Sequence, residues 1–339
     1  MVKDSSVKQK ILFYLPEGSI NDATKYYIEI LESSFSDFFE VVIVKSLKEQ
    51  SNVKYILTIE AKHFFLAKLK FPKAKIINWF QGVVAEEALM TKGSLWRKYL
   101  WAFFESFTLK YSFFNIYVSR RMKKYFEDTY HISSSFFYIM PCFNKDLNLE
   151  LINKEKYQYP TFVYAGSLAT WQCVDKTLEL YSLIERVLPN ASLTLLTKEK
   201  ELAETMINNY KIKNYSIKYV SLENLDTELL KYKYGFLIRE NHIVNNVATP
   251  TKMNSYLANG IIPIYSSFID DFKVNFNEYD FIVAKEKTQD VLNDIVNFEK
   301  YGFNREVFFI NLSKIFDTYY NREKYAEELS KYIGDNLIV

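Results

Sequence analysis

The sequence predicts an α/β protein with two tandem Rossmann-like domains, each built on a parallel sheet. Short apolar runs with strand character alternate with amphipathic helical segments along the whole chain. The runs are almost continuously apolar, which is typical of parallel strands that helices cover on both faces. The length of 339 residues is enough for two domains, and the polar segment Asn144–Pro160 separates two series of runs.

Each series contains six expected strands, joined by segments that have the apolar period of a helix. In the first half the strands are expected at residues 10–15, 41–44, 55–59, 75–80, 115–119 and 136–140. In the second half they are expected at residues 162–166, 193–197, 217–220, 235–239, 261–265 and 281–284. We expect the N-terminal domain to span residues 1–147 and the C-terminal domain residues 155–310. Residues 311–339 are expected to be helical, and either close the second domain or reach back to the first.

Composition indicates a globular protein and excludes the disordered class. Aromatic residues make up 17% of the chain, charged residues 25%, and the net charge is +2, which is typical of a globular protein. No nucleic-acid-binding motif is present, so nucleic acid is not an expected partner. Two cysteines are too few for a disulfide framework and indicate free thiols in a reducing compartment. Because no signal peptide and no apolar run of spanning length is found, we expect a cytoplasmic protein.

The most informative stretch is FLIRENHIVNNVATPTKMNSYLANGIIPIY, which joins two expected strands through a helix. The first strand ends in Arg239. Thr249 is expected to cap the helix with its side-chain oxygen, and Pro250 to occupy the first helical position. Lys252 follows in the first turn, and Gly260 supplies the left-handed stop. Cations at a strand end and at a helix N-terminus predict a phosphate site, whereas the alternative is two solvated surface residues.

Three of the eight glycines, Gly18, Gly82 and Gly166, fall at or just after the ends of expected strands. The carboxyl ends of parallel strands border the ligand crevice of an open α/β sheet, and glycine lets backbone amides approach an anion there. In YAGSLATW, Gly166 and Ser167 offer amides and a hydroxyl to a phosphate, although this loop is neither a Walker loop nor a GxGxxG fingerprint. A simple chain turn is the alternative for each glycine taken alone.

Several blocks resemble GT-B-fold glycosyltransferases, especially family 4-like enzymes. PTKMNSYLANGIIPIY is similar to their P-x-K-x-x-E-Y-L-A-x-G-x-P-V-I block. NIYVSRRMKKYF and FYIMPCFNKD are similar to the elements that precede the donor domain, and FVYAGSLATWQCVDKTLELY is similar to the start of that domain. The matches keep the family's order over nearly the whole chain. The resemblance implies the GT-B architecture, with an acceptor-side N-terminal domain, a nucleotide-sugar-binding C-terminal domain and a cleft between them.

The resemblance also implies roles for particular residues. Arg239 and Lys252 would stabilise the diphosphate leaving group, so that neither a metal nor a cofactor is expected, and the chain contains no D-x-D triplet. Gln81 and Gly82 match the loop that faces the sugar or acceptor. The candidate donor-binding residues are Gly18, Gly166, Ser167, Arg239, His242, Asn246, Thr251, Lys252 and Ser255.

The expected activity is transfer of a sugar from a nucleotide-sugar to a glycan, lipid-linked or glycoprotein acceptor, with retention of configuration. Glu86 and Glu87 are the acidic candidates for catalysis, and their alternative role is to favour a helix dipole. Ser255 stands where the family block has a glutamate that holds the ribose, and serine cannot make a bidentate carboxylate contact. Two alternatives therefore stay open: a non-catalytic GT-B scaffold subunit and a nucleotide-sugar epimerase.

Residues 92–124 are unusual in charge and aromatic content. They carry eight Lys or Arg and one acidic residue, Glu105, among many aromatic residues. A basic amphipathic helix with Trp and Phe can lie on an anionic membrane surface, which would give a peripheral location at the inner face of a membrane. The alternative is a core helix whose aromatic face packs on the sheet.

Overall fold

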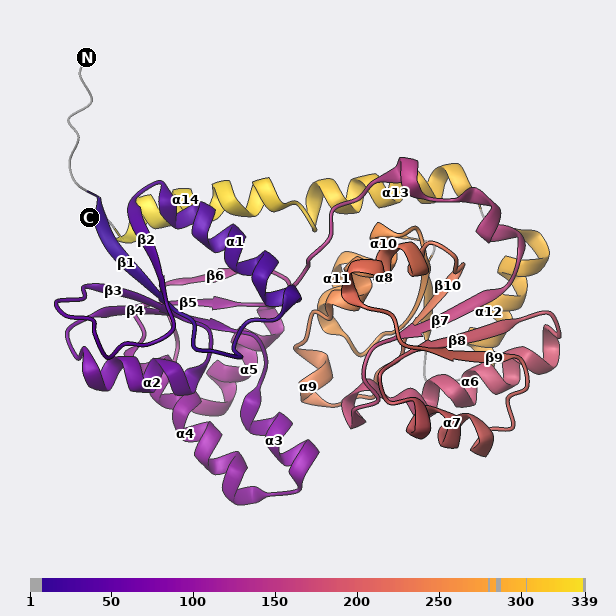
Figure 1. Ribbon diagram of the computed structural model, residues 1–339, viewed down its shortest axis with the longest axis horizontal. Coiled ribbons are helices and arrows are strands. Elements are labelled where there is room, and N and C mark those ends of the chain that lie inside the picture. The colour runs from indigo at the N-terminus through magenta and orange to yellow at the C-terminus, as the bar shows by residue number, and fades with distance from the viewer. Residues whose placement is uncertain (1–7, 280, 285–287, 303, 338–339) are drawn as a thin grey trace, which may run out of the picture. The chain divides into compact units, whose positions relative to one another are not determined.

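The computed structural model describes residues 8–279, 281–284, 288–302 and 304–337. The chain forms two compact units, whose elements are labelled in Figure 1. The first unit contains the described residues of 1–144, 247–249 and 321–339. The second unit contains those of 145–246 and 250–320. The chain therefore returns to the first unit twice, through a three-residue segment and through its last helix.

The first unit is built on a parallel six-stranded sheet with the order β2-β1-β3-β4-β5-β6. All six expected strands of the first half are confirmed, with ends that differ by at most two residues from those expected. Their bounds are β1 (Gln9–Tyr14), β2 (Phe39–Val44), β3 (Tyr55–Thr58), β4 (Lys75–Phe80), β5 (Phe114–Tyr117) and β6 (Phe137–Ile139). Strand order reverses between β1 and β3, which border each other in parallel.

The second unit has a parallel six-stranded sheet with the order β12-β11-β10-β7-β8-β9. The six strands expected in the second half are confirmed as well. Their bounds are β7 (Thr161–Ala165), β8 (Ser192–Leu196), β9 (Tyr215–Lys218), β10 (Tyr234–Leu237), β11 (Ile262–Ser266) and β12 (Ile282–Ala284). In this sheet the order reverses between β7 and β10, and ligands of such sheets bind outside the carboxyl ends of the strands at the reversal.

Helices cover both faces of the first sheet. In Figure 1, α1 and α14 lie on one face, whereas α2 and α4 lie on the other. The bounds are α1 (Asp22–Ser36), α2 (Ala61–Lys70), α3 (Val84–Lys92), α4 (Leu95–Tyr111), α5 (Arg120–Tyr130) and α14 (Arg322–Leu337). Leu329 and Ile333 of α14 are fully buried, because this helix completes the layer formed by α1.

The second unit contains eight α-helices among its described residues. Their bounds are α6 (Val174–Val187), α7 (Lys200–Asn209), α8 (Leu222–Leu229), α9 (Ile243–Asn246), α10 (Thr251–Ala258), α11 (Asp270–Asn275), α12 (Thr288–Tyr301) and α13 (Arg305–Thr318). The expected C-terminal helical region is thus two helices, and α13 and α14 belong to different units. None of the described helices is long and apolar enough to cross a membrane.

The start of α10 differs from the sequence-based prediction. Pro250 is the N-cap residue, and the helix begins at Thr251. The prediction that Thr249 caps this helix is wrong, because its hydroxyl accepts a hydrogen bond from the Cys142 N–H at 2.9 Å within the first unit. The predicted stop is confirmed, since Gly260 has a φ of +64° just beyond the helix end.

Candidate functional site

Two cations, Arg239 and Lys252, meet at one amide oxygen in the second unit. Arg239 follows β10, and its Nη2 donates to Gln172 Oε1 at 2.6 Å. Lys252 stands in the first turn of α10, and its Nζ donates to the same oxygen at 3.1 Å. Gln172 belongs to a short 3₁₀ turn (Thr170–Gln172) in the loop that leads from β7 to α6. The three side chains therefore lie outside the carboxyl ends of β7 and β10, where the strand order of this sheet reverses.

Arg239 is fixed by several hydrogen bonds. Its residue is 5% exposed, and its backbone N–H donates to Ser266 Oγ at 2.7 Å. Nη1 donates to the carbonyl oxygens of Gln172 and Ile238, both at 2.9 Å. Burial lowers the pKa of Arg239 from its ordinary value, but a guanidinium keeps its charge at neutral pH. The fold thus holds a permanent positive charge in a preset position.

Lys252 is the second cation, and its charge is harder to maintain. Its Nζ lies 3.9 Å from the ring centroid of Tyr164. Burial and then the neighbouring Arg239 guanidinium hold the pKa of Lys252 well below its usual range. Neither cation forms an ion pair with another described residue. Two adjacent cations without a counter-charge favour the binding of an anion with more than one negative charge.

Gly166 brings the backbone to this pair of cations. Its φ of +142° is a conformation that other residues rarely adopt, and a Cβ there would lie 3.2 Å from Lys252 Nζ. Ser167 follows it with an exposed side chain, and its carbonyl accepts from Tyr164 Oη at 2.5 Å. The structure therefore brings together Gly166, Arg239 and Lys252, which the sequence singled out separately.

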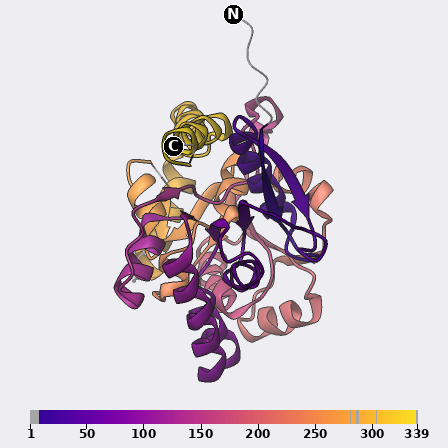
Figure 2. The ribbon, with the colours of Figure 1, turned by 90° about the vertical axis from the view of Figure 1, so that its left-hand side faces the viewer.

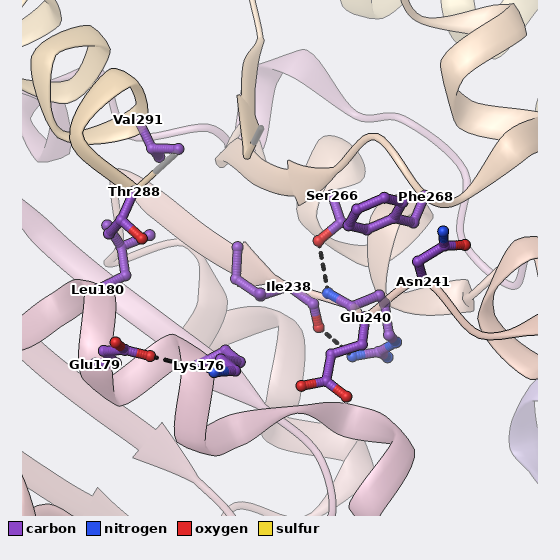
Figure 3. A pocket seen from close by; sticks show the side chains of 11 residues that line it. Lys176, Glu179, Leu180, Ile238, Glu240, Asn241, Ser266, Phe268, Thr288 and Val291 are labelled. Atoms are coloured by element: carbon purple, nitrogen blue, oxygen red, sulfur yellow. Dashed lines mark hydrogen bonds and ion pairs between the residues drawn. The ribbon is translucent and has the colours of Figure 1, made fainter. Parts of the chain in front are cut away.

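A pocket of about 290 Å³ adjoins Arg239 at the carboxyl ends of β10 and β11 (Figure 3). Ile238, Leu180 and Val291 give it apolar walls, and Ser266 adds a hydroxyl beside the Arg239 backbone. Among the residues that the structure describes, the pocket is lined by Lys176, Glu179, Leu180, Ile238, Arg239, Glu240, Asn241, Ser266, Phe268, Thr288 and Val291. The pocket is close to the lower limit of size for small-ligand sites.

Other expected donor residues support the loop between β10 and α10. His242 Nδ1 accepts from the Val244 N–H at 3.2 Å, and Asn246 Nδ2 donates to the Phe268 carbonyl at 2.8 Å. Thr251 is the first residue of α10, and Ser255 lies one turn further along. These contacts give His242 and Asn246 a bracing role in the loop that carries Arg239.

The remaining expected residues lie in the first unit, after β1 and β4. Gly18 has a φ of +79° in an exposed turn. Gln81 Nε2 donates to the Ile59 carbonyl at 3.1 Å. Glu87 covers Gly82 so closely that a Cβ there would lie 2.2 Å from its carboxylate oxygen. A side chain at position 82 would therefore displace the end of the flexible Glu87 side chain.

The two candidate catalytic carboxyl groups have different surroundings. Glu86 is engaged by Lys98 at 2.8 Å and by the Tyr125 hydroxyl at 2.9 Å. Burial raises the pKa of Glu87 from its ordinary value. Glu105 accepts from the Ala85 N–H at 3.0 Å, and burial raises its pKa to about 7. Glu105 thereby positions the start of α3, and Glu87 is the better candidate of the original pair.

The sequence matches no protein-family model and no curated protein. Solved structures do resemble the chain. HepE from Anabaena, in complex with UDP-glucose, has a TM-score of 0.69 over 96% of this chain and 99% of its own, at 9% identity. This chain has the GT-B fold. Both Rossmann-like units of the GT-B fold were predicted from the sequence, and that prediction is confirmed.

Two larger proteins share the fold. TarM from S. aureus, in complex with UDP and other ligands, has a TM-score of 0.63 at 12% identity over 84% of this chain. The pneumococcal O-GlcNAc transferase GtfA, in complex with UDP and GlcNAc, has a TM-score of 0.62 at 10% identity over 85% of this chain. The chain spans only 57% of TarM and 58% of GtfA.

Two residues of the site were missed by sequence reasoning. Gln172 and Tyr164 both lie in the block FVYAGSLATWQC, which was singled out only for its glycine and serine. The contacts of Gln172 depend on side chains that are 67 and 80 positions away in the chain. A neutral glutamine carries no charge signal, so only its place in the same loop as Gly166 pointed to it.

Proposed function

We propose that this chain is a glycosyltransferase that transfers a sugar from a nucleotide-sugar donor. The observation that carries the proposal is the convergence of Arg239 and Lys252 on one oxygen acceptor at the strand-order reversal of the second sheet. A diphosphate oxygen is a stronger acceptor for these donors than a neutral amide. The UDP complexes of HepE, TarM and GtfA support a nucleoside diphosphate as the ligand.

In this proposal the two cations stabilise the leaving group. The acceptor hydroxyl oxygen forms a bond to the sugar as the bond from the sugar to the diphosphate breaks. The hydroxyl proton is released, and negative charge grows on the diphosphate oxygen. Arg239 is preset by its backbone contacts, so that little reorganisation is needed at that moment. The acceptor is a glycan, a lipid-linked sugar or a glycoprotein, and the reaction retains configuration without a metal. Glu87 is the proposed proton-exchanging carboxyl group.

Calorimetric titration with UDP tests the donor site. Replacing Arg239 or Lys252 by alanine should weaken UDP binding by roughly ten- to a hundredfold each, since a hydrogen bond to a charged group contributes about 1.5–3 kcal/mol. Arg186→Ala and Lys200→Ala are matched controls, because both residues are exposed cations on other helices of the same unit. UDP binding that is equal in all five proteins would refute this donor site.

A scaffold subunit is the second candidate, favoured by one observation. Ser255 has no carboxylate where the family resemblance expects one for the ribose. Release of the free sugar from UDP-glucose and related donors distinguishes the two candidates. Turnover that is lost in Arg239→Ala supports the enzyme, and UDP binding without turnover by any donor supports the scaffold. A changed sugar configuration in the recovered nucleotide-sugar would indicate an epimerase.

A further inference from the structure

We propose that α4 and the adjoining part of α2 form a docking surface for an anionic lipid bilayer. The surface, called here the α2–α4 patch, lies in the first unit and does not depend on the donor site. Its members are apolar or aromatic side chains that stay exposed in the folded chain. They are Leu66, Leu69, Leu95, Trp96, Tyr99, Leu100 and Phe103.

The exposure of the aromatic members is high. Trp96 is 71% exposed, Tyr99 is 69% exposed and Phe103 is 50% exposed. With Leu100 they follow the spacing i, i+3, i+4 and i+7, which places them along one side of α4. The opposite side of the same helix carries Leu109 and other buried residues. The alternative expectation, a helix that packs in the core, therefore applies only to the buried side of α4.

Helix α2 extends the patch beside α4. The Phe65 ring meets the Phe103 ring edge to face at 5.6 Å, so the two helices pack at this point. Leu66 and Leu69 continue the exposed apolar surface on α2. Figures 1 and 2 show α4 projecting from the sheet of the first unit. Large exposed apolar patches of this kind mark surfaces that contact another phase or partner.

The charge around the patch selects an anionic partner. Residues 61–111 contain nine Lys or Arg and three Glu. Glu105 is buried, and Glu86 is paired with Lys98. Lys92, Arg97 and Lys110 are exposed and form no ion pair with any described residue.

The composition of the patch favours a bilayer over a protein. Interfacial helices combine Trp and aliphatic residues on one face with Lys and Arg on the other, whereas lysine is depleted in protein–protein interfaces. Tyr and Trp also concentrate at the level of lipid headgroups. Residues beyond α4 contribute less to this surface than their basic and aromatic composition indicates. In α5, Met122 and Phe126 are buried, and Lys123 is paired with Glu127 at 2.6 Å.

Sedimentation with vesicles tests the proposal on the full chain. Vesicles of phosphatidylcholine alone are compared with vesicles that also contain phosphatidylglycerol. The patch variant combines Trp96→Ser, Tyr99→Ser and Phe103→Ser, and the charge variant combines Arg97→Glu and Lys110→Glu. The matched control combines Tyr159→Ser, Tyr301→Ser and Ile310→Ser, whose side chains in the second unit are 63%, 74% and 66% exposed.

We expect the unmodified chain and the matched control to bind the anionic vesicles equally. The patch variant should bind at least about tenfold more weakly, because it loses the apolar contribution. The charge variant should lose its preference for phosphatidylglycerol. UDP binding should stay unchanged in all of them, so failure of the donor site and failure of this surface are distinguishable.

Three results would overturn the proposal. The first is that the unmodified chain fails to sediment with either kind of vesicle. The second is that the patch variant sediments as well as the matched control. The third is self-association in light scattering without lipid that the patch variant abolishes, since the patch would then be an interface between protein chains.

Discussion

Gln172 is the residue on which the site depends most closely. Its single amide oxygen accepts from Arg239 and Lys252, and the Tyr164 hydroxyl lies 3.3 Å away from it. A neutral oxygen between two cations satisfies their geometry without neutralising their charge. A phosphate oxygen of the proposed donor would take the place of the Gln172 oxygen, so this side chain competes with the ligand.

Changing the charge of Gln172 tests that competition. Gln172→Glu should weaken UDP binding by at least about tenfold, because a carboxylate pairs with both cations and repels the diphosphate. Gln172→Ala should bind UDP at least as tightly as the unmodified chain. Titration calorimetry measures both, and Gln158→Glu adds the same charge at an exposed position of the same unit as a control. Weaker binding by the alanine variant would show that Gln172 holds the ligand instead.

The lowered pKa of Lys252 predicts a pH dependence of UDP binding. In the free protein the ammonium loses its proton more readily than an ordinary lysine, whereas a bound diphosphate favours the charged form and raises the pKa. UDP affinity should therefore fall as pH rises through the lowered pKa of Lys252, and binding should take up a proton above it. Calorimetry in buffers of different ionisation enthalpy, from about pH 6 to about pH 9, measures both effects.

Lys252→Met is the control for this pH dependence. The variant should bind UDP weakly, but with an affinity that changes little over the same pH range. A slope that persists in Lys252→Met would assign the titration to another group.

Among the elements, α10 has the most direct influence on the site. It is eight residues long, and its first turn carries Lys252. Its C-terminal end is held by a neighbouring 3₁₀ segment (Lys154–Gln158). Lys156 Nζ donates to the Asn259 carbonyl and Tyr157 Oη to the Gly260 carbonyl, each at 2.5 Å. These contacts set the position of the helix and hence of its N-terminal cation.

Alanine substitutions at Gly260 and Gly93 distinguish the cost of left-handed backbone strain from the cost of side-chain crowding at a helix end. Gly260→Ala should lower the free energy of unfolding by about 2–5 kcal/mol, because left-handed strain of about 1–2 kcal/mol adds to overpacking of about 1–3 kcal/mol. A Cβ at this position would lie 2.8 Å from Ile152 Cγ2. Gly93→Ala has a similar φ of +60° but open space around it, so only the strain should appear. Urea unfolding measures both, and equal losses would show that the packing around Gly260 yields easily.

At the scale of the whole molecule, the two units are not two consecutive stretches of the chain. The last helix, α14, belongs to the first unit although α13 belongs to the second. The Tyr332 ring of α14 stacks on Phe114 of β5 at 5.2 Å. The first unit is therefore complete only after the second has been synthesised.

Calorimetric unfolding should separate the contributions of the two units. Leu329→Ala should destabilise the first unit by about 2–5 kcal/mol, because it opens a cavity beneath α14. UDP at about a hundred times its Kd should stabilise the second unit by about 2.7 kcal/mol. We expect Leu329→Ala to lower one unfolding transition while UDP still raises the other. Loss of the UDP-induced shift in Leu329→Ala would contradict separate units.

The sequence by itself determined the fold class, because it depends on local patterns. All twelve strands were predicted from short apolar runs, and Gly260 was recognised as a stop from its place after a helical period. The capping prediction for Thr249 failed because its hydroxyl has a partner 107 positions earlier in the chain, which no local pattern reveals.

The tertiary structure alone decided how the site is assembled. Arg239 and Lys252 were recognisable as cations at element ends, but their meeting at Gln172 depends on the order of β7 and β10 in the sheet. The structure likewise decided which aromatic residues of α4 are exposed, since the sequence period leaves two sides of that helix apolar. The physical reason is the same in both cases: a local pattern determines the form of an element, whereas contacts between distant elements determine what its side chains meet.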